Sequence, residues 1–158
     1  MPKRSAGILL FRRRSGPAPE VLLVHPGGPF WTKKDEAAWG IPKGEYDPGE
    51  DALDAAKREF AEETGARPEG QFIAFGSFRQ SRGKTVEVWA VEGDFDPARL
   101  KSNSFTMEWP PRSGRMQQFP EVDRAQWFTL AEAARKLHKG QVPILAALLA
   151  RLGAGAAG

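Results

Sequence analysis

Cysteine is absent from this chain of 158 residues. Its absence excludes disulfide bonds, thiol catalysis and zinc sites built from thiolates, and it fits a reducing compartment. The composition, with 41% hydrophobic and 27% charged residues, is ordinary for a globular protein. A chain of this length can bury a sizeable core without metal or disulfide cross-links.

Long apolar runs are missing as well. No stretch approaches the roughly 18 residues that are needed to cross a bilayer. The N-terminal sequence MPKRSAGILLFRRRSG has only a short apolar stretch before its arginines, which is not the pattern of a secretory signal. We therefore expect a cytoplasmic protein with no membrane partner.

Internal repeats and interdomain linkers are also lacking, so we expect a single domain over residues 1–152 and a disordered Gly/Ala tail over 153–158. Alternating and apolar patterns predict strands at 5–12, 20–25, 71–80, 84–91, 116–119 and 122–128. Further helices are expected at 130–139 and 141–152. Strands on both sides of one internal helix, with helices at the end, indicate an α/β fold with a mixed sheet covered on both faces.

One region, 94–114, has no clear periodicity and is rich in Pro, Ser and Arg. A compact domain seldom carries so long an irregular segment unless it binds something. We expect a functional loop here, or a loop that contains a short helix.

The charge balance is mildly basic, with a formal net charge of +3. The basic residues are dispersed apart from 12–14 and 33–34, and no basic stripe is interleaved with aromatics. We therefore expect no nucleic-acid partner. A mildly basic protein with an acidic helix face suits a small, phosphate-rich substrate.

The most informative segment is GEYDPGEDALDAAKREFAEETGA, at residues 44–66. On a helix, Glu59, Glu62 and Glu63 share one face, because residues three and four apart are neighbours. They fall in the last turns, where the helix dipole disfavours anions. A bound cation would relieve this, and magnesium prefers a few carboxylates together with substrate phosphates.

Local signals set the ends of this helix. Asp47 is the expected N-cap, with Pro48 at the first helical position. Glu50 follows the cap by three residues, and Gly65 lies just past the expected end. The apolar face that should turn to the core carries Leu53, Ala56 and Phe60.

The same segment carries a family pattern. Gly44, five residues, Glu50, seven residues and then Arg58-Glu59-Phe60-x-Glu62-Glu63-x-Gly65 resembles the signature of the Nudix hydrolases. The pattern departs at Ala66, where a larger aliphatic residue is usual. The resemblance implies a Nudix-type α/β/α sandwich with a mixed β-sheet. It also implies hydrolysis of a nucleoside diphosphate linked to another group.

The resemblance also implies roles for the residues of the segment. Glu59, Glu62 and Glu63 would bind magnesium, or manganese in its place, together with the backbone carbonyl of Lys43. Gly44 would allow a close backbone approach. Glu59 would also activate the water, and Arg58 would hold the helix carboxylates in place. One more carboxylate ligand is expected from a later loop, and the candidates are Glu108 and Glu121.

Further residues could bind the substrate. Candidates for phosphate oxygens are Lys43, Lys84, Arg112 and Arg115. Gly44 would lie beside the same phosphates. Aromatic side chains in loops could stack on a base, although such side chains more often pack beneath the loop. These candidates are Phe30, Trp31, Trp109 and Phe119.

Beyond the signature, two regions resemble the diadenosine polyphosphate hydrolase branch. They are SAGILLFRR…EVLLVHPGGPFW…AWGIPKGE within residues 5–45 and FPEVDRAQWFTLAEAARKL at residues 119–137. The first hypothesis is therefore an asymmetric dinucleoside polyphosphate hydrolase of the diadenosine tetraphosphate type. A housecleaning nucleoside triphosphate pyrophosphohydrolase, acting on oxidised nucleotides among others, is the alternative enzyme. A non-catalytic Nudix-fold module that senses a nucleotide is the alternative of another class. A monomer and a homodimer both remain open.

Overall fold

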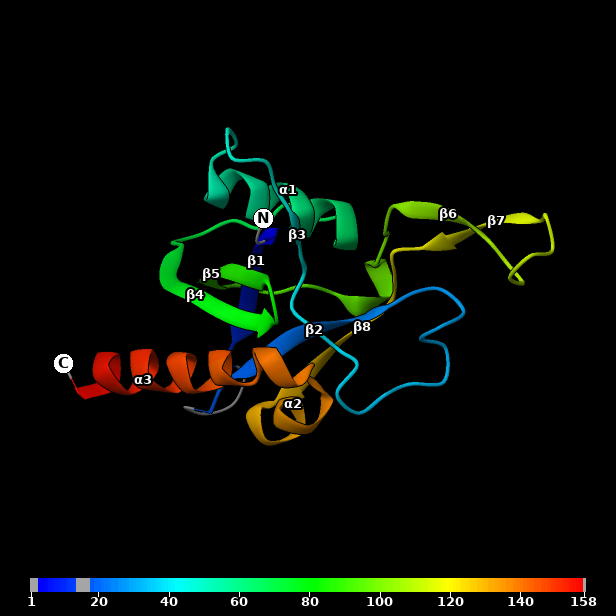
Figure 1. Ribbon diagram of the computed structural model, residues 1–158. Coiled ribbons are helices and arrows are strands. Elements are labelled where there is room, and N and C mark those ends of the chain that lie inside the picture. Colours follow the sequence, from blue (N-terminus) through cyan, green and yellow to red (C-terminus); the bar gives the residue numbers. More distant parts are fainter. Residues whose placement is uncertain (1–2, 14–17, 158) are drawn as a thin grey trace.

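The computed structural model describes residues 3–13 and 18–157 (Figure 1). Its strands are β1 (Lys3–Arg12), β2 (Glu20–Pro26), β3 (Lys43–Glu45), β4 (Ile73–Ser81), β5 (Lys84–Glu92), β6 (Ser104–Glu108), β7 (Met116–Pro120) and β8 (Val122–Thr129). Its helices are α1 (Ala52–Thr64), α2 (Leu130–Lys136) and α3 (Pro143–Ala157), with short 3-10 turns η1 (Pro97–Arg99) and η2 (Lys139–Gln141).

The main sheet is mixed and divides at β1. Its strand order is β4-β5-β1-β2-β8, and β3 also pairs with β1. One edge of β1 runs parallel to β5 along most of its length. The other edge pairs with β3 at residues 5–7 and with β2 at residues 11–12. Strands β2 and β3 therefore separate between these points, and a cavity described below lies where they part.

Helices cover both faces of this sheet, with α1 on one side and α2 and α3 on the other (Figure 1). Strand β1 is buried on both faces and reads as an almost continuous apolar run. Ile8 packs in the same cluster as Phe60 of α1, whereas Leu9 packs with Leu137 and Ile144 on the opposite side. The expected α/β/α sandwich with a mixed sheet is confirmed.

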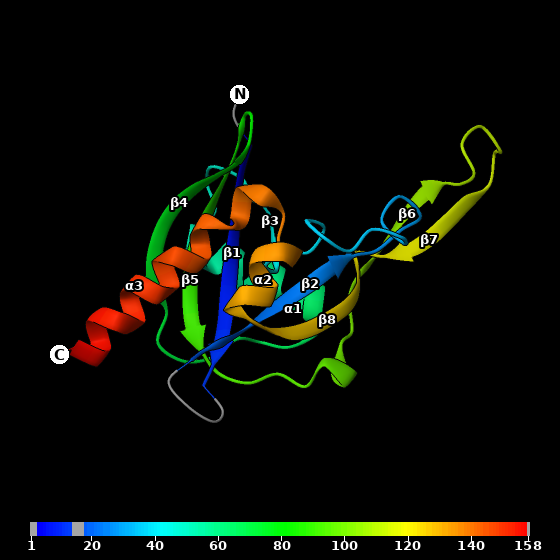
Figure 2. The same cartoon turned by 90° about the horizontal axis from the view of Figure 1, so that it is seen from below.

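A second, two-stranded sheet is formed by β6 and β7 and projects away from the main body (Figures 1 and 2). The expected short helix in 94–114 is present as η1, but the strand β6 was not predicted. Phe105 lies opposite Phe119 in the ladder. The loop 27–38 runs next to the hairpin. The ring of Phe30 in this loop packs edge to face on the ring of Trp109 in the hairpin turn, with 5.3 Å between the ring centroids.

The C-terminal helices differ from the expected bounds. α2 ends at Lys136, three residues early, because Leu137 turns away to form a parallel bridge with Trp39. α3 begins at Pro143 and continues to Ala157, through most of the segment where we expected a disordered tail. Alanine, the best helix former, is frequent there. Gly158 lies outside the described residues. Across the described ranges, the helices lack the length and apolar character needed to cross a membrane.

Candidate active site

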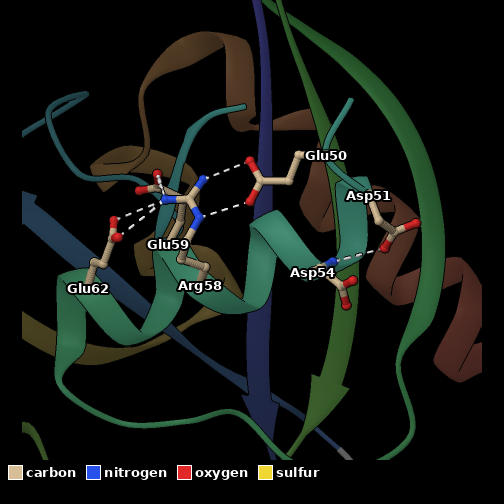
Figure 3. A network of polar contacts seen from close by, with 6 residues as sticks. All are labelled: Glu50, Asp51, Asp54, Arg58, Glu59 and Glu62. Atoms are coloured by element: carbon tan, nitrogen blue, oxygen red, sulfur yellow. Dashed lines mark hydrogen bonds and ion pairs between the residues drawn. The ribbon is translucent and has the colours of Figure 1, made fainter. Parts of the chain in front are cut away.

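Helix α1 carries the acidic face, and its N-terminus differs from the sequence prediction. The N-cap is Asp51, whose side chain accepts a hydrogen bond from the Asp54 N–H at 3.0 Å (Figure 3). Asp47 is not the cap, because its carbonyl accepts from the Glu50 N–H at 2.9 Å in a separate turn. The predicted end is confirmed, since Gly65 has a φ of 84° just past the last helical residue.

The inner face of α1 is also shifted from the expected one. Ala55, Ala56 and Phe60 are buried, whereas Leu53 is only half-buried. Because the helix packs on Ala55, the side chain of Glu59, one turn later on the same face, is directed into the protein. It is only 9% exposed.

Arg58 is the centre of a polar network on this helix (Figure 3). Its guanidinium group donates to both oxygens of Glu50, at 3.0 and 3.2 Å. It also donates to Glu59 at 2.8 Å and to Glu62 at 3.3 Å. These contacts raise the pKa of Arg58, that with Glu50 most of all. Glu50 precedes the N-cap Asp51, whereas the sequence predicted it three residues after the cap.

The Glu59 carboxylate lies against the backbone of Gly44 in β3. A Cβ atom on Gly44 would lie 2.0 Å from Oε2 of Glu59, so only glycine fits without moving that carboxylate. Burial raises the pKa of Glu59, while its hydrogen bond with Arg58 acts in the opposite direction. The close approach expected at Gly44 is therefore present, and Glu59 is the group that approaches.

Glu63 is held beside β3 by the Lys43 N–H, which donates to its Oε1 at 3.2 Å. Burial raises the pKa of Glu63 to about 8, although the charge of Lys43 opposes the change. Burial likewise lowers the pKa of Lys43, with Glu63 again acting in the opposite direction. The two side chains stabilise each other's charge in a poorly solvated place.

The structure separates the two candidates for the additional carboxylate. Glu121 lines the same cavity as Glu63. Its pKa is raised, first by burial and then by the charge of Glu62. Glu108 is exposed and accepts from the Arg112 N–H at 2.9 Å in the turn of the hairpin. Glu121 is thus the acid that lies with the acidic helix.

A cavity of about 210 Å³ lies where β2 and β3 separate. Its charged and polar lining consists of Lys43, Glu63, Gln80, Glu121, His138 and Gln141. Its apolar lining includes Val24, Trp31, Trp39, Ile41 and Val122. Trp31 therefore lies where a base or ribose could contact it.

The other predicted substrate ligands lie elsewhere. Lys84 does not line the cavity, but it is close enough for its charge to lower the pKa of Lys43. Trp109, Arg112 and Arg115 belong to the projecting hairpin and the turn at its end, outside the cavity lining.

The donor set suits a hard divalent cation. In the part of the chain that the structure describes, no three acidic or histidine side chains form a ready-made metal cluster. Arg58 instead contacts Glu59 and Glu62. Carboxylate oxygens are nevertheless the ligands that magnesium takes. The raised pKa values of Glu59, Glu63 and Glu121 have a contribution from neighbouring carboxylates, and a cation would relieve that repulsion.

Sequence reasoning missed several residues of the cavity wall, among them His138 and Gln141. Gln141 is fully enclosed; its Oε1 accepts from the Ile41 N–H at 2.9 Å and its Nε2 donates to Gln80 at 3.2 Å. Neither residue belongs to a local motif. The one available signal was that His138 is one of only two histidines in the chain.

The α/β/α sandwich thus sets a carboxylate-bearing helix beside a partly charged cavity. The family model of the NUDIX domain matches residues 1–148. The chain belongs to the Nudix family.

Individual relatives agree with this assignment. The asymmetrical bis(5'-nucleosyl)-tetraphosphatase of Rattus norvegicus is 32% identical over 125 residues, which cover 69% of this chain and 79% of the relative. The Sus scrofa protein of the same name is 32% identical over 123 residues, covering 69% of this chain and 79% of the relative. A Caenorhabditis elegans Ap4A hydrolase structure, a binary complex, aligns with a TM-score of 0.63 and 24% identity, over 96% of this chain and 98% of that one.

Family and relatives together make this protein an enzyme, a pyrophosphohydrolase that acts on phosphoric anhydride bonds. Nudix hydrolases act on small nucleotide substrates and generally use divalent metal ions.

Proposed function

We propose that this enzyme is a magnesium-dependent hydrolase that cleaves dinucleoside polyphosphates of the diadenosine tetraphosphate type asymmetrically. The observation that carries the proposal is the 32% identity to the asymmetrical tetraphosphatase of rat over 79% of that protein. The site agrees in chemistry, because the Lys43 side chain and the carboxylates of Glu63 and Glu121 border one cavity.

The metal ligands would be Glu59, Glu62, Glu63 and Glu121, together with the carbonyl of Lys43. When bound, magnesium, or manganese in its place, neutralises phosphate charge and makes a bound water more acidic. By its place in the signature, Glu59 would accept a proton from the attacking water. Its side chain is buried and its pKa is raised, as suits a general base.

Arg58 would position the carboxylates without touching the substrate. It holds Glu59 and Glu62 on one side and the fixed carboxylate of Glu50 on the other. The fork to Glu50 is bidentate, a geometry that fixes orientation as well as charge. Loss of this anchor would allow both helix carboxylates to move.

The cavity would enclose only part of the substrate. Pockets that enclose a whole small molecule usually exceed about 300 Å³, and this cavity measures about 210 Å³. Lys43 lines it and would contact the phosphates, with Lys84 nearby. Trp31 would contact one nucleoside, and the other nucleoside would extend over the surface.

A panel of substrates tests the proposal. Diadenosine tetraphosphate, the eight common nucleoside triphosphates and an oxidised guanine nucleotide are assayed in parallel with magnesium, and products are separated chromatographically. We expect diadenosine tetraphosphate to have the highest kcat/KM and to yield ATP and AMP. Hydrolysis confined to triphosphates would instead identify a nucleoside triphosphate pyrophosphohydrolase.

The same panel distinguishes a sensor from an enzyme. Tight nucleotide binding at one molecule per chain, with no turnover at stoichiometric enzyme, would indicate a non-catalytic module. The acidic side chains of the signature are all retained, which favours turnover.

A further inference from the structure

The segment 137–141 forms a fixed wall of the cavity. The N–H of His138 donates to the Trp39 carbonyl at 2.8 Å, and the side chain of Gln141 accepts from Ile41 at 2.9 Å. Gly140 packs so closely on β4 that a Cβ atom there would lie 1.9 Å from the Gln80 carbonyl oxygen. The wall is therefore bound to the segment 39–41, which precedes β3, and to β4.

Within this wall, the hydrogen bonds of His138 assign the position of its proton. Its Nδ1 accepts from the Gly140 N–H at 3.1 Å, so in the neutral ring the hydrogen is on Nε2. Among the described residues, none accepts a hydrogen bond from that Nε2–H. The side chain is half-buried and lines the cavity. Its Nε2–H is available to a molecule that the cavity holds.

Two lysines are close enough for their charges to act on this ring. Burial lowers the pKa of His138, and the charges of Lys43 and Lys84 lower it further. The ring is therefore neutral at physiological pH and keeps the tautomer that its turn selects. An anion drawn to the two lysines would come within reach of a hydrogen-bond donor that carries no charge itself.

We propose that His138 is a substrate-binding residue whose Nε2–H donates to a phosphate oxygen of the bound polyphosphate, beside Lys43 and Lys84. The inference rests on the proposed function, since it presumes a polyphosphate in this cavity. His138 would orient the phosphate chain in ground and transition states alike, so its loss should raise KM more than it lowers kcat.

The test measures binding of methylenediphosphonate, a diphosphate that cannot be hydrolysed, with magnesium by titration calorimetry. In His138→Asn the amide oxygen can replace Nδ1 in the turn, but the donor is too short to reach the ligand. In His138→Gln the amide nitrogen reaches the position of Nε2. We expect about tenfold weaker binding in His138→Asn, as for one hydrogen bond to a charged group. His138→Gln should bind within about threefold of the wild type.

Two controls accompany these variants. Lys139→Gln removes the exposed neighbouring cation, which lies outside the cavity lining, and should change affinity by less than about twofold. The melting temperature should be equal in the wild type, His138→Asn and Lys139→Gln, because the turn is preserved in these three forms.

The outcomes separate this inference from the proposed function. Any of four results would overturn the role of His138. The first two are wild-type affinity in His138→Asn and equal losses of affinity in His138→Gln and His138→Asn. The other two are an equal loss in Lys139→Gln and no binding by the wild type. Unchanged diphosphonate binding with a raised KM for nucleotides would place His138 against a base instead. Binding that depends on His138 in a protein that hydrolyses none of the panel would refute the proposed function alone.

Discussion

Gly44 and Glu59 are in direct contact between β3 and α1, with no room for a side chain on the glycine. The atoms that a Cβ would meet belong to the end of the Glu59 side chain, which can rotate away. Gly44→Ala should therefore displace the carboxylate and leave the fold intact. Since misplacement by about 1 Å can cost about a hundredfold in rate, we expect a loss of that order in kcat.

Gly49→Ala is the matched control for this variant. No atom lies within 4 Å of a Cβ built at Gly49, so kcat and the melting temperature should both be unchanged. Equal kcat in the two variants would show that the contact between Gly44 and Glu59 has no catalytic importance.

The three carboxylates of the helix should differ in importance. Glu59→Gln should lower kcat by about 10² to 10⁴, because it removes ligand charge and basicity together. Glu63→Gln should be nearly as severe. Glu62→Gln should be milder, since that side chain is 35% exposed and lies at the edge of the acidic face. Steady-state kinetics decide the order, and a larger loss in Glu62→Gln than in Glu59→Gln would contradict the assigned roles.

The fourth carboxylate offers a matched pair. Glu121→Gln should lower kcat, because Glu121 lines the cavity and interacts with Glu62. Glu108→Gln should leave kcat unchanged, since Glu108 bonds within the hairpin turn. The same substitution in both positions controls for the chemical change. A reduced kcat in Glu108→Gln, with an unchanged kcat in Glu121→Gln, would show instead that the hairpin supplies the fourth carboxylate.

Metal should affect both activity and stability. Excess chelator should abolish turnover, and magnesium should restore it. Magnesium should also raise the melting temperature, because it binds acids that are gathered only in the folded state. The stabilisation is about 2.7 kcal/mol when the ion is at a hundred times its Kd. Potassium chloride at equal ionic strength is the control. Full turnover in chelator would contradict the metal-dependent mechanism.

Stability without metal should depend on pH through Glu63. Its pKa in the folded protein is about 8, against an ordinary value of 4.5. Between these values the folded state binds more protons than the unfolded state, so the free energy of unfolding falls as pH rises. One proton gives a slope of at most about 1.4 kcal/mol per pH unit. Denaturant titrations from pH 5 to 8 measure the slope, and Glu63→Gln should make it shallower.

Local patterns were enough to predict the acidic helix and strand β4 after it, but not the short strand β3 before it. The C-terminal boundary at Gly65 was correct because a glycine in the left-handed conformation ends a helix through local geometry alone. The N-terminal boundary was wrong because two aspartates compete for the cap. Asp47 is followed by Pro48 and Gly49, which form a turn of their own, and the helix begins after Asp51.

The remaining parts depend on contacts between distant residues. Strand β6 exists because Phe105 pairs with Phe119 across the hairpin, and no alternation in 94–114 was strong enough to indicate it. His138 reaches the cavity because Trp39 bridges to Leu137. Such pairings are set by tertiary packing between distant residues, which cannot be predicted from the local patterns of a single sequence.

Because the sheet divides at β1, the cavity of the active site is lined by residues from many parts of the chain. The walls of the cavity come from β2, β3, α1, β4, β8 and the turn after α2. A nascent chain that has emerged from the ribosome only as far as β5 already contains the complete signature, but has neither Glu121 nor His138. The enzyme should therefore gain its ligand affinity late in synthesis, in one step, when its last third folds back onto the first.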